Sequence, residues 1–126
     1  MNLHTKFTPG NTFNSSGSKF TILLRKDNLL LSEQRINGKL VAYEITAVAI
    51  RPERIFRDGK WITTGDTVEQ YPGAEAFGKG KYDWSFNSAE KDTAIGYFDL
   101  CVKGIIKTSR DLKFQKIKDL IKSEGL

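Results

Sequence analysis

The densest group of side chains able to bind an anion lies between residues 51 and 61. Four cations recur there at every third position, with a tryptophan directly after the last: Arg51, Arg54, Arg57, Lys60 and Trp61. Cations neutralise phosphates and aromatic rings stack on bases, so this mixture suits single-stranded nucleic acid. The alternative is a solvated strand edge on which Arg51 and Arg54 pair with Glu53 and Glu44, and the cations prevent sheet-to-sheet aggregation.

A second stretch rich in glycine and lysine runs from Phe77 to Lys81. It has the composition of a phosphate-binding loop but lacks the Gly-x-x-x-x-Gly-Lys-Ser/Thr spacing, and it precedes a predicted strand rather than a helix. The alternative is a flexible loop. Lys79 and Lys81, with Tyr71 upstream, complete the predicted ligand-binding set.

Residues that could support catalysis are few. Asp66, Glu69 and Glu75 lie in one loop and could hold a divalent ion, but no Asp-x-Asp-x-Asp-Gly motif supports this. The single cysteine, Cys101, lies on an apolar stripe that suits an inert buried thiol, and the single histidine, His4, lies in a polar segment. We therefore expect no catalytic residues, no metal and no cofactor, and we interpret the protein as a non-enzyme.

The elements that position these residues begin with a predicted meander over 19–51. Apolar residues alternate there with period two, which predicts antiparallel strands near 19–25, 29–36 and 39–51. Asn37-Gly38 predicts a type I′ turn, because both of its central residues need a positive φ. Pro52 is expected to end the third strand, since proline cannot donate to the ladder.

Residues 52–63 predict a second hairpin, with Asp58-Gly59 at its turn. A long loop is expected over 64–80, and a loop of that length in a compact domain usually has a function or is mobile. One further strand is expected from Tyr82 to Phe86, with Trp84 and Phe86 facing the core.

Two helices are predicted at the C-terminal end. Asn87 with Glu90 three residues later predicts a capped start for the first. Its apolar stripe follows helical spacing: Ala94, Phe98, Cys101, Val102 and Ile105. The second is expected to begin at Thr108 or Ser109 and to end at Gly125. Its apolar face is predicted to be Phe114, Ile117, Leu120 and Ile121.

These elements predict an α+β fold in which an antiparallel meander closes into a small SH3-like barrel or a strongly curled sheet, followed by two helices. We expect a single domain over 1–126, with a β-rich part (7–63), the long loop (64–80), and a strand with two helices (81–126). The predicted core includes Ile22, Ile45, Trp84, Phe98 and Val102.

Four consecutive segments carry a resemblance to a known family. They are a Pro-Gly-x-x-Phe turn, a Gly-Ser-Lys-Phe-Thr-Ile-Leu strand, a Leu-Leu-Leu-Ser strand and the strand Tyr43-Glu44-Ile45. Over residues 7–50 this pattern resembles the small SH3-like barrels of uncharacterised phage and mobile-element proteins. The resemblance implies a barrel that binds nucleic acid or protein and does not choose between them. Residues 52–126 have no counterpart in a minimal barrel.

Charge also favours an anionic partner. The net charge is +5, and residues 1–62 carry ten Lys and Arg against five Asp and Glu. No run of 18 apolar residues is present, and the N-terminus lacks an apolar signal segment, so we expect no membrane partner and a cytoplasmic location.

The expected function is that of a small binding protein for nucleic acid or a nucleotide, through the basic hairpin. The first alternative is a phage-type inhibitor or adaptor that docks on an acidic host or defence protein. The second is capture of a small phosphorylated signal. The oligomeric state is not indicated.

Overall fold

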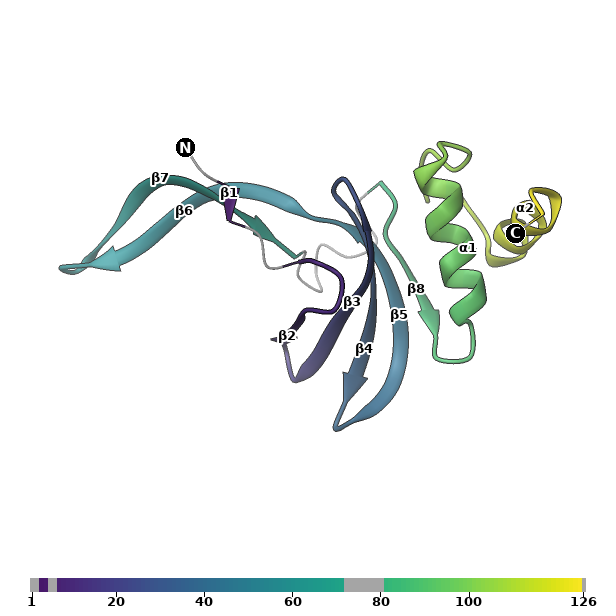
Figure 1. Ribbon diagram of the computed structural model, residues 1–126, viewed down its shortest axis with the longest axis horizontal. Helices are drawn as coiled ribbons and strands as arrows, with labels where there is room; N and C mark the ends of the chain where they lie inside the picture. The colour runs from purple at the N-terminus through teal and green to yellow at the C-terminus, as the bar shows by residue number, and fades with distance from the viewer. Residues whose placement is uncertain (1–2, 5–6, 72–80, 126) are drawn as a thin grey trace.

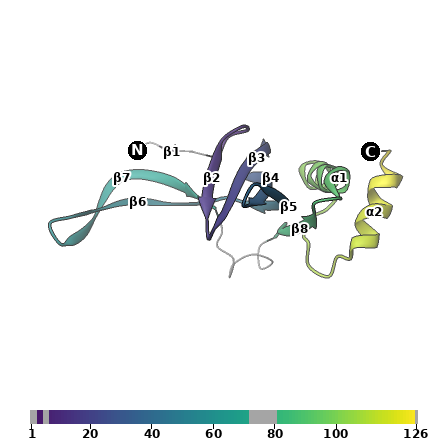
Figure 2. The same ribbon diagram turned by 90° about the horizontal axis from the view of Figure 1, so that it is seen from below.

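The computed structural model describes residues 3–4, 7–71 and 81–125, and these form an α+β architecture (Figure 1, Figure 2). The elements in chain order are β1 Leu3–His4, β2 Thr12–Ser15, β3 Ser18–Lys26, β4 Leu29–Ile36, β5 Lys39–Ala47, β6 Ala49–Arg57, β7 Lys60–Gln70, β8 Trp84–Asn87, α1 Lys91–Val102 and α2 Phe114–Ser123. They make a five-stranded sheet, β2-β3-β4-β5-β8, and a three-stranded sheet, β1-β7-β6.

The five-stranded sheet is the predicted meander with a strand added at each edge. Its pairings are all antiparallel, and β3, β4 and β5 pair in sequence order. Asn37 and Gly38 have φ values of 52° and 79°, as a type I′ turn requires. The prediction of an antiparallel meander is therefore confirmed.

This sheet curls strongly but does not close (Figure 1). Its edge strands are β2 and β8, and the described strands contain no pairing between them. Of the two outcomes expected from the sequence, the curled sheet is the one observed. Its two faces bury different sets of residues.

One face of the sheet packs against α1, which contacts β4, β5 and β8. Buried side chains from both layers form this main core: Leu31, Tyr43, Ile45, Phe86, Tyr97, Phe98 and Leu100. The helix α2 packs mainly on α1, where it fits closely because Gly96 has no side chain, and the centroid of its Phe114 ring lies 6.1 Å from that of the Phe86 ring of β8. A Cβ atom at Gly96 would lie 2.8 Å from Cδ1 of Ile121.

The opposite face of the sheet buries a smaller cluster, formed by Phe7, Ile22, Leu30 and Val48. Four aromatic rings cover it, with neighbouring centroids 4.9–6.0 Å apart: Phe7, Phe13, Phe20 and Tyr71. The N-terminal segment is thereby packed onto the meander.

Two predicted boundaries in the β region are wrong. The third strand ends at Ala47, and β6 starts at Ala49 and continues through Pro52. Proline is tolerated there because β6 is an edge strand, and the pairing with β7 is irregular between Pro52 and Arg54. The predicted loop is also too long, since β7 extends to Gln70; residues 72–80 of that loop lie outside the described residues.

Both helices are shorter than predicted. The first begins at Lys91 with Glu90 at its N-cap, while Asn87 accepts a hydrogen bond from the backbone of Ala89 in the preceding turn. Because this helix ends at Val102, that residue and Ile105 are exposed by 39% and 37%, contrary to prediction.

The second helix begins at Phe114, several residues after the predicted caps, and Phe114 is itself 36% exposed. The core predictions for Ile22, Ile45 and Phe98 are confirmed, and Trp84 is half-buried.

None of the helices in the described ranges is both long enough and apolar enough to cross a bilayer.

Candidate functional site

Four of the basic residues singled out in the sequence belong to a two-stranded ribbon that projects from the molecule (Figure 1, Figure 2): Arg51, Arg54, Arg57 and Lys60. This ribbon is the β6–β7 hairpin, residues 49–70, which we call the arm; residues 54–63 are its tip. Asp58 and Gly59 form the turn, with φ values of 53° and 78°, so the predicted type I′ hairpin is confirmed. Beyond its base, the arm presents both faces to solvent.

Pairing register assigns each tip residue to a face of the ribbon. The cross-strand pairs are Arg54 with Thr63, Ile55 with Ile62, Phe56 with Trp61, and Arg57 with Lys60. Because side chains alternate along a strand and paired residues share a face, one face carries Arg54 with the aromatic pair. The other face carries Arg57 and Lys60. The cations are therefore distributed over both faces rather than gathered on one.

The aromatic pair at the tip is open to solvent. Phe56 is 63% exposed and Trp61 is 64% exposed, and their ring centroids lie 5.4 Å apart. The guanidinium carbon of Arg54 lies 5.8 Å from the centroid of the Trp61 ring. This cation–π contact places the arginine beside an exposed ring. The ring can contact a base while the guanidinium contacts a neighbouring phosphate.

The tip cations are not neutralised within the part of the chain that the structure describes. Arg54, Arg57 and Lys60 are exposed and form no ion pair with a described residue. The two carboxylates considered as their partners are engaged elsewhere: Glu53 accepts from Thr64, and Glu44 accepts from Tyr71. The alternative of a self-neutralised strand edge therefore does not describe the arm.

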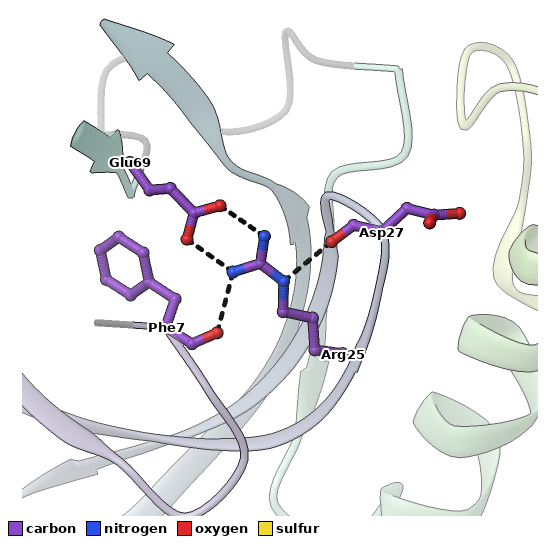
Figure 3. A network of polar contacts seen from close by, with 4 residues as sticks. All are labelled: Phe7, Arg25, Asp27 and Glu69. Carbon is purple, nitrogen blue, oxygen red and sulfur yellow. Dashed lines mark hydrogen bonds and ion pairs between the residues drawn. The ribbon is translucent and has the colours of Figure 1, made fainter. Parts of the chain in front are cut away.

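The base of the arm is held to the curled sheet by Arg25 of β3 (Figure 3). Its guanidinium donates to both carboxylate oxygens of Glu69 on β7, at 2.6 and 2.5 Å. It also donates to the backbone oxygens of Phe7 and Asp27, at 3.0 and 2.8 Å. The Glu69 side chain is 1% exposed. This bidentate contact joins the two sheets where the arm leaves the body.

The other predicted ligand-binding residues lie away from the tip. Arg51 is exposed near the base of the arm, opposite Val68. Lys81 is exposed just before β8, and its Nζ lies 5.3 Å from the centroid of the Tyr82 ring. Lys79 lies outside the described residues. Tyr71, directly after β7, is half-buried against the sheet.

Tyr71 belongs to a polar cluster that the sequence analysis missed. Its hydroxyl donates to Oε2 of Glu44 at 3.0 Å and lies 3.0 Å from the hydroxyl oxygen of Ser32. Beside it, Thr46 donates to Oδ1 of Asp83 at 2.8 Å. Burial raises the pKa of Glu44, and the charge of Asp83 adds to that rise. The cluster links the end of the arm to β4 and β5.

The Glu44 carboxyl predicts a pH-dependent stability. The pKa of Glu44 is higher in the folded than in the unfolded state. At a pH between these two pKa values, folding therefore takes up a proton, and the free energy of unfolding falls as pH rises through this range. Glu44→Gln keeps an acceptor for Tyr71 and removes the titration. Chemical denaturation from about pH 4 to 8 is therefore expected to show a smaller decline for the variant than for the wild type. If stability declined equally in the variant and the wild type, burial would not be raising the pKa of Glu44.

The single cysteine is not reactive near neutral pH. Burial raises the pKa of the Cys101 thiol to about 12, so the reactive thiolate is not populated there.

A groove of about 870 Å³ lies between the helices and the end of β3, with Leu24, Ile95, Phe98 and Ile121 among its lining residues. Its lining also includes two carboxylates and two lysines. In the described ranges, no group of three or more His, Cys, Asp or Glu could hold a metal ion.

Comparison of the chain with known proteins identifies no matching family model, no matching curated protein and no matching solved structure.

Proposed function

We propose that this protein binds nucleic acid through the arm and does so without catalysing a reaction on it. The observation that supports the proposal most directly is the state of the tip cations, which are exposed and unpaired among the described residues. A cation without a carboxylate partner is free to neutralise a phosphate and release its counterions. This counterion release supplies most of the non-specific affinity of proteins for nucleic acid. The exposed Trp61 ring adds an apolar surface that bases can contact.

The test is binding of the wild-type chain to fluorescent nucleic acids at several salt concentrations. Anisotropy would be measured with single-stranded DNA, single-stranded RNA and duplex DNA, from about 50 to 200 mM salt. If the four arm cations each contact a phosphate, log affinity should fall against log salt with a slope of roughly −3 to −4. No binding to any of the three at the lowest salt would refute the proposal.

A second function is favoured by the apolar residues of the arm. Ile50, Phe56, Trp61 and Ile62 are exposed by 37–64%, and exposed apolar groups often mark protein interfaces. On this proposal the arm docks on an acidic protein. Binding would then depend mainly on Phe56 and Trp61, so Trp61→Ala would abolish it, and its salt dependence would be shallower than the slope of roughly −3 to −4 expected for nucleic acid.

A further inference from the structure

We propose that the ligand of the arm is duplex DNA in the B form, and that the tip enters its major groove. This inference rests on the proposed function and makes it specific, because it selects a double-stranded over a single-stranded ligand. It is carried by three properties of the arm: its dimensions, the distribution of its cations over two faces, and its fixed attachment to the body.

The dimensions of the arm match the major groove. A two-stranded ribbon that carries side chains on both faces is about 10 Å thick, close to the spacing of stacked sheets. The major groove is about 12 Å wide and 8.5 Å deep and admits such a ribbon, whereas the minor groove is about 6 Å wide. From Ala49 to Arg57, β6 extends about 25 Å, so its tip can reach base edges while the body stays outside.

The cations suit a site with phosphates on both sides. Arg54 lies on one face of the tip, and Arg57 and Lys60 lie on the other. A single strand that stacks on the Trp61 face would leave the second face unused. A groove has a phosphate strand along each wall, so a ribbon inside it can use the cations of both faces at once.

The tip also carries groups that can read base edges. Arginine and lysine donate to guanine, and the carboxylate of Asp58 at the turn could accept from the amino group of cytosine. Phe56 and Trp61 provide apolar contact for thymine methyl groups, which lie in the same groove. The A-form RNA duplex has a deep, narrow major groove that excludes the ribbon, so duplex RNA should bind less tightly than duplex DNA.

Attachment of the arm supports insertion as a preformed unit. Two-stranded hairpins are marginally stable in isolation, and an unanchored arm would lose conformational entropy on binding. Here the bidentate contact of Arg25 with Glu69 fixes β7 at the base (Figure 3). The strand β1 pairs with β7 beside this contact. The cost of ordering the base of the arm is therefore met in the free protein.

The first test compares ligands of one sequence with the full chain at a single low salt concentration. We expect duplex DNA to bind at least about tenfold more tightly than either of its single strands, and duplex RNA more weakly than duplex DNA. Equal or tighter binding to single strands would overturn this inference and leave the proposed function standing. No binding to any ligand would refute both.

The second test asks which groove is occupied. Duplex DNA whose cytosines carry a glucosyl group on a C5-hydroxymethyl has its major groove filled, because C5 substituents project there. We expect this modification to abolish binding, and we expect the minor-groove ligand netropsin to leave binding unchanged. Competition by netropsin, or full affinity for glucosylated DNA, would overturn the inference.

The third test separates the two faces. Arg54→Gln alters one face, and Arg57→Gln with Lys60→Gln alters the other; the control is Lys91→Gln with Lys116→Gln on the exposed surfaces of α1 and α2. Both arm variants should weaken duplex binding and make its salt dependence shallower, by about one unit of slope for each cation removed. The control should keep wild-type affinity. An effect confined to one arm face would contradict insertion between two phosphate walls.

Discussion

Replacing Arg25 with methionine is expected to lower the free energy of unfolding by about 3–5 kcal/mol. The substitution leaves the Glu69 carboxylate, 1% exposed, without the guanidinium that binds both of its oxygens. Removal of one member of a buried ion pair costs more than the pair contributes, because the remaining charge stays desolvated. Urea denaturation of the variant and the wild type would measure the difference.

The matched control for this prediction is the double variant Arg25→Met with Glu69→Met. It removes the buried charge together with its partner and fills the space with apolar atoms, so it should recover much of the lost stability. A single variant as stable as the wild type would mean that the base of the arm is not held by this contact. A double variant less stable than Arg25→Met alone would show that the Glu69 carboxylate has a second essential role.

The sequence predicted the meander well because its determinants are local. Asn37-Gly38 and Asp58-Gly59 each need a positive φ at two positions, and the flanking apolar residues alternate. The break between β5 and β6 has no such signal, since it falls at Val48 within an alternating run. The backbone N–H of Val48 donates to the carbonyl of Asn28, a contact between distant segments that alternation cannot indicate.

The candidate site was predictable to the same extent. The tip cations and Trp61 are adjacent in the sequence, so their common place on one hairpin could be predicted. The polar cluster could not, because its hydrogen bonds join residues 27 to 39 positions apart in the sequence. One available signal was Ser32 itself, a polar residue at an inward position of an apolar strand.

The Arg25–Glu69 contact was missed for a related reason. The sequence predicts Glu69 to lie in a loop of acidic residues, where a carboxylate is usually solvated. The extension of β7 to Gln70 places it instead at a buried position facing Arg25. A strand boundary that is wrong by a few residues thus changes the interpretation of a charged side chain.

Reversing two charges at the tip is expected to have the largest effect on binding. Arg54→Glu with Arg57→Glu should weaken binding to nucleic acid by far more than tenfold at moderate salt, because two phosphate contacts become repulsions. The fold should tolerate the change. Both side chains are exposed, and a glutamate at position 57 would lie across the turn from Lys60, an opposite charge.

The control for that variant must carry the same net charge. Lys91→Glu with Lys116→Glu also lowers the net charge from +5 to +1, on exposed positions of α1 and α2. If binding depends on the arm, the control should bind within a few-fold of the wild type at about 150 mM salt, where charges more than about 8 Å from the ligand are screened. Equal losses in the two variants would mean that overall charge attracts the ligand and that the arm is not its site.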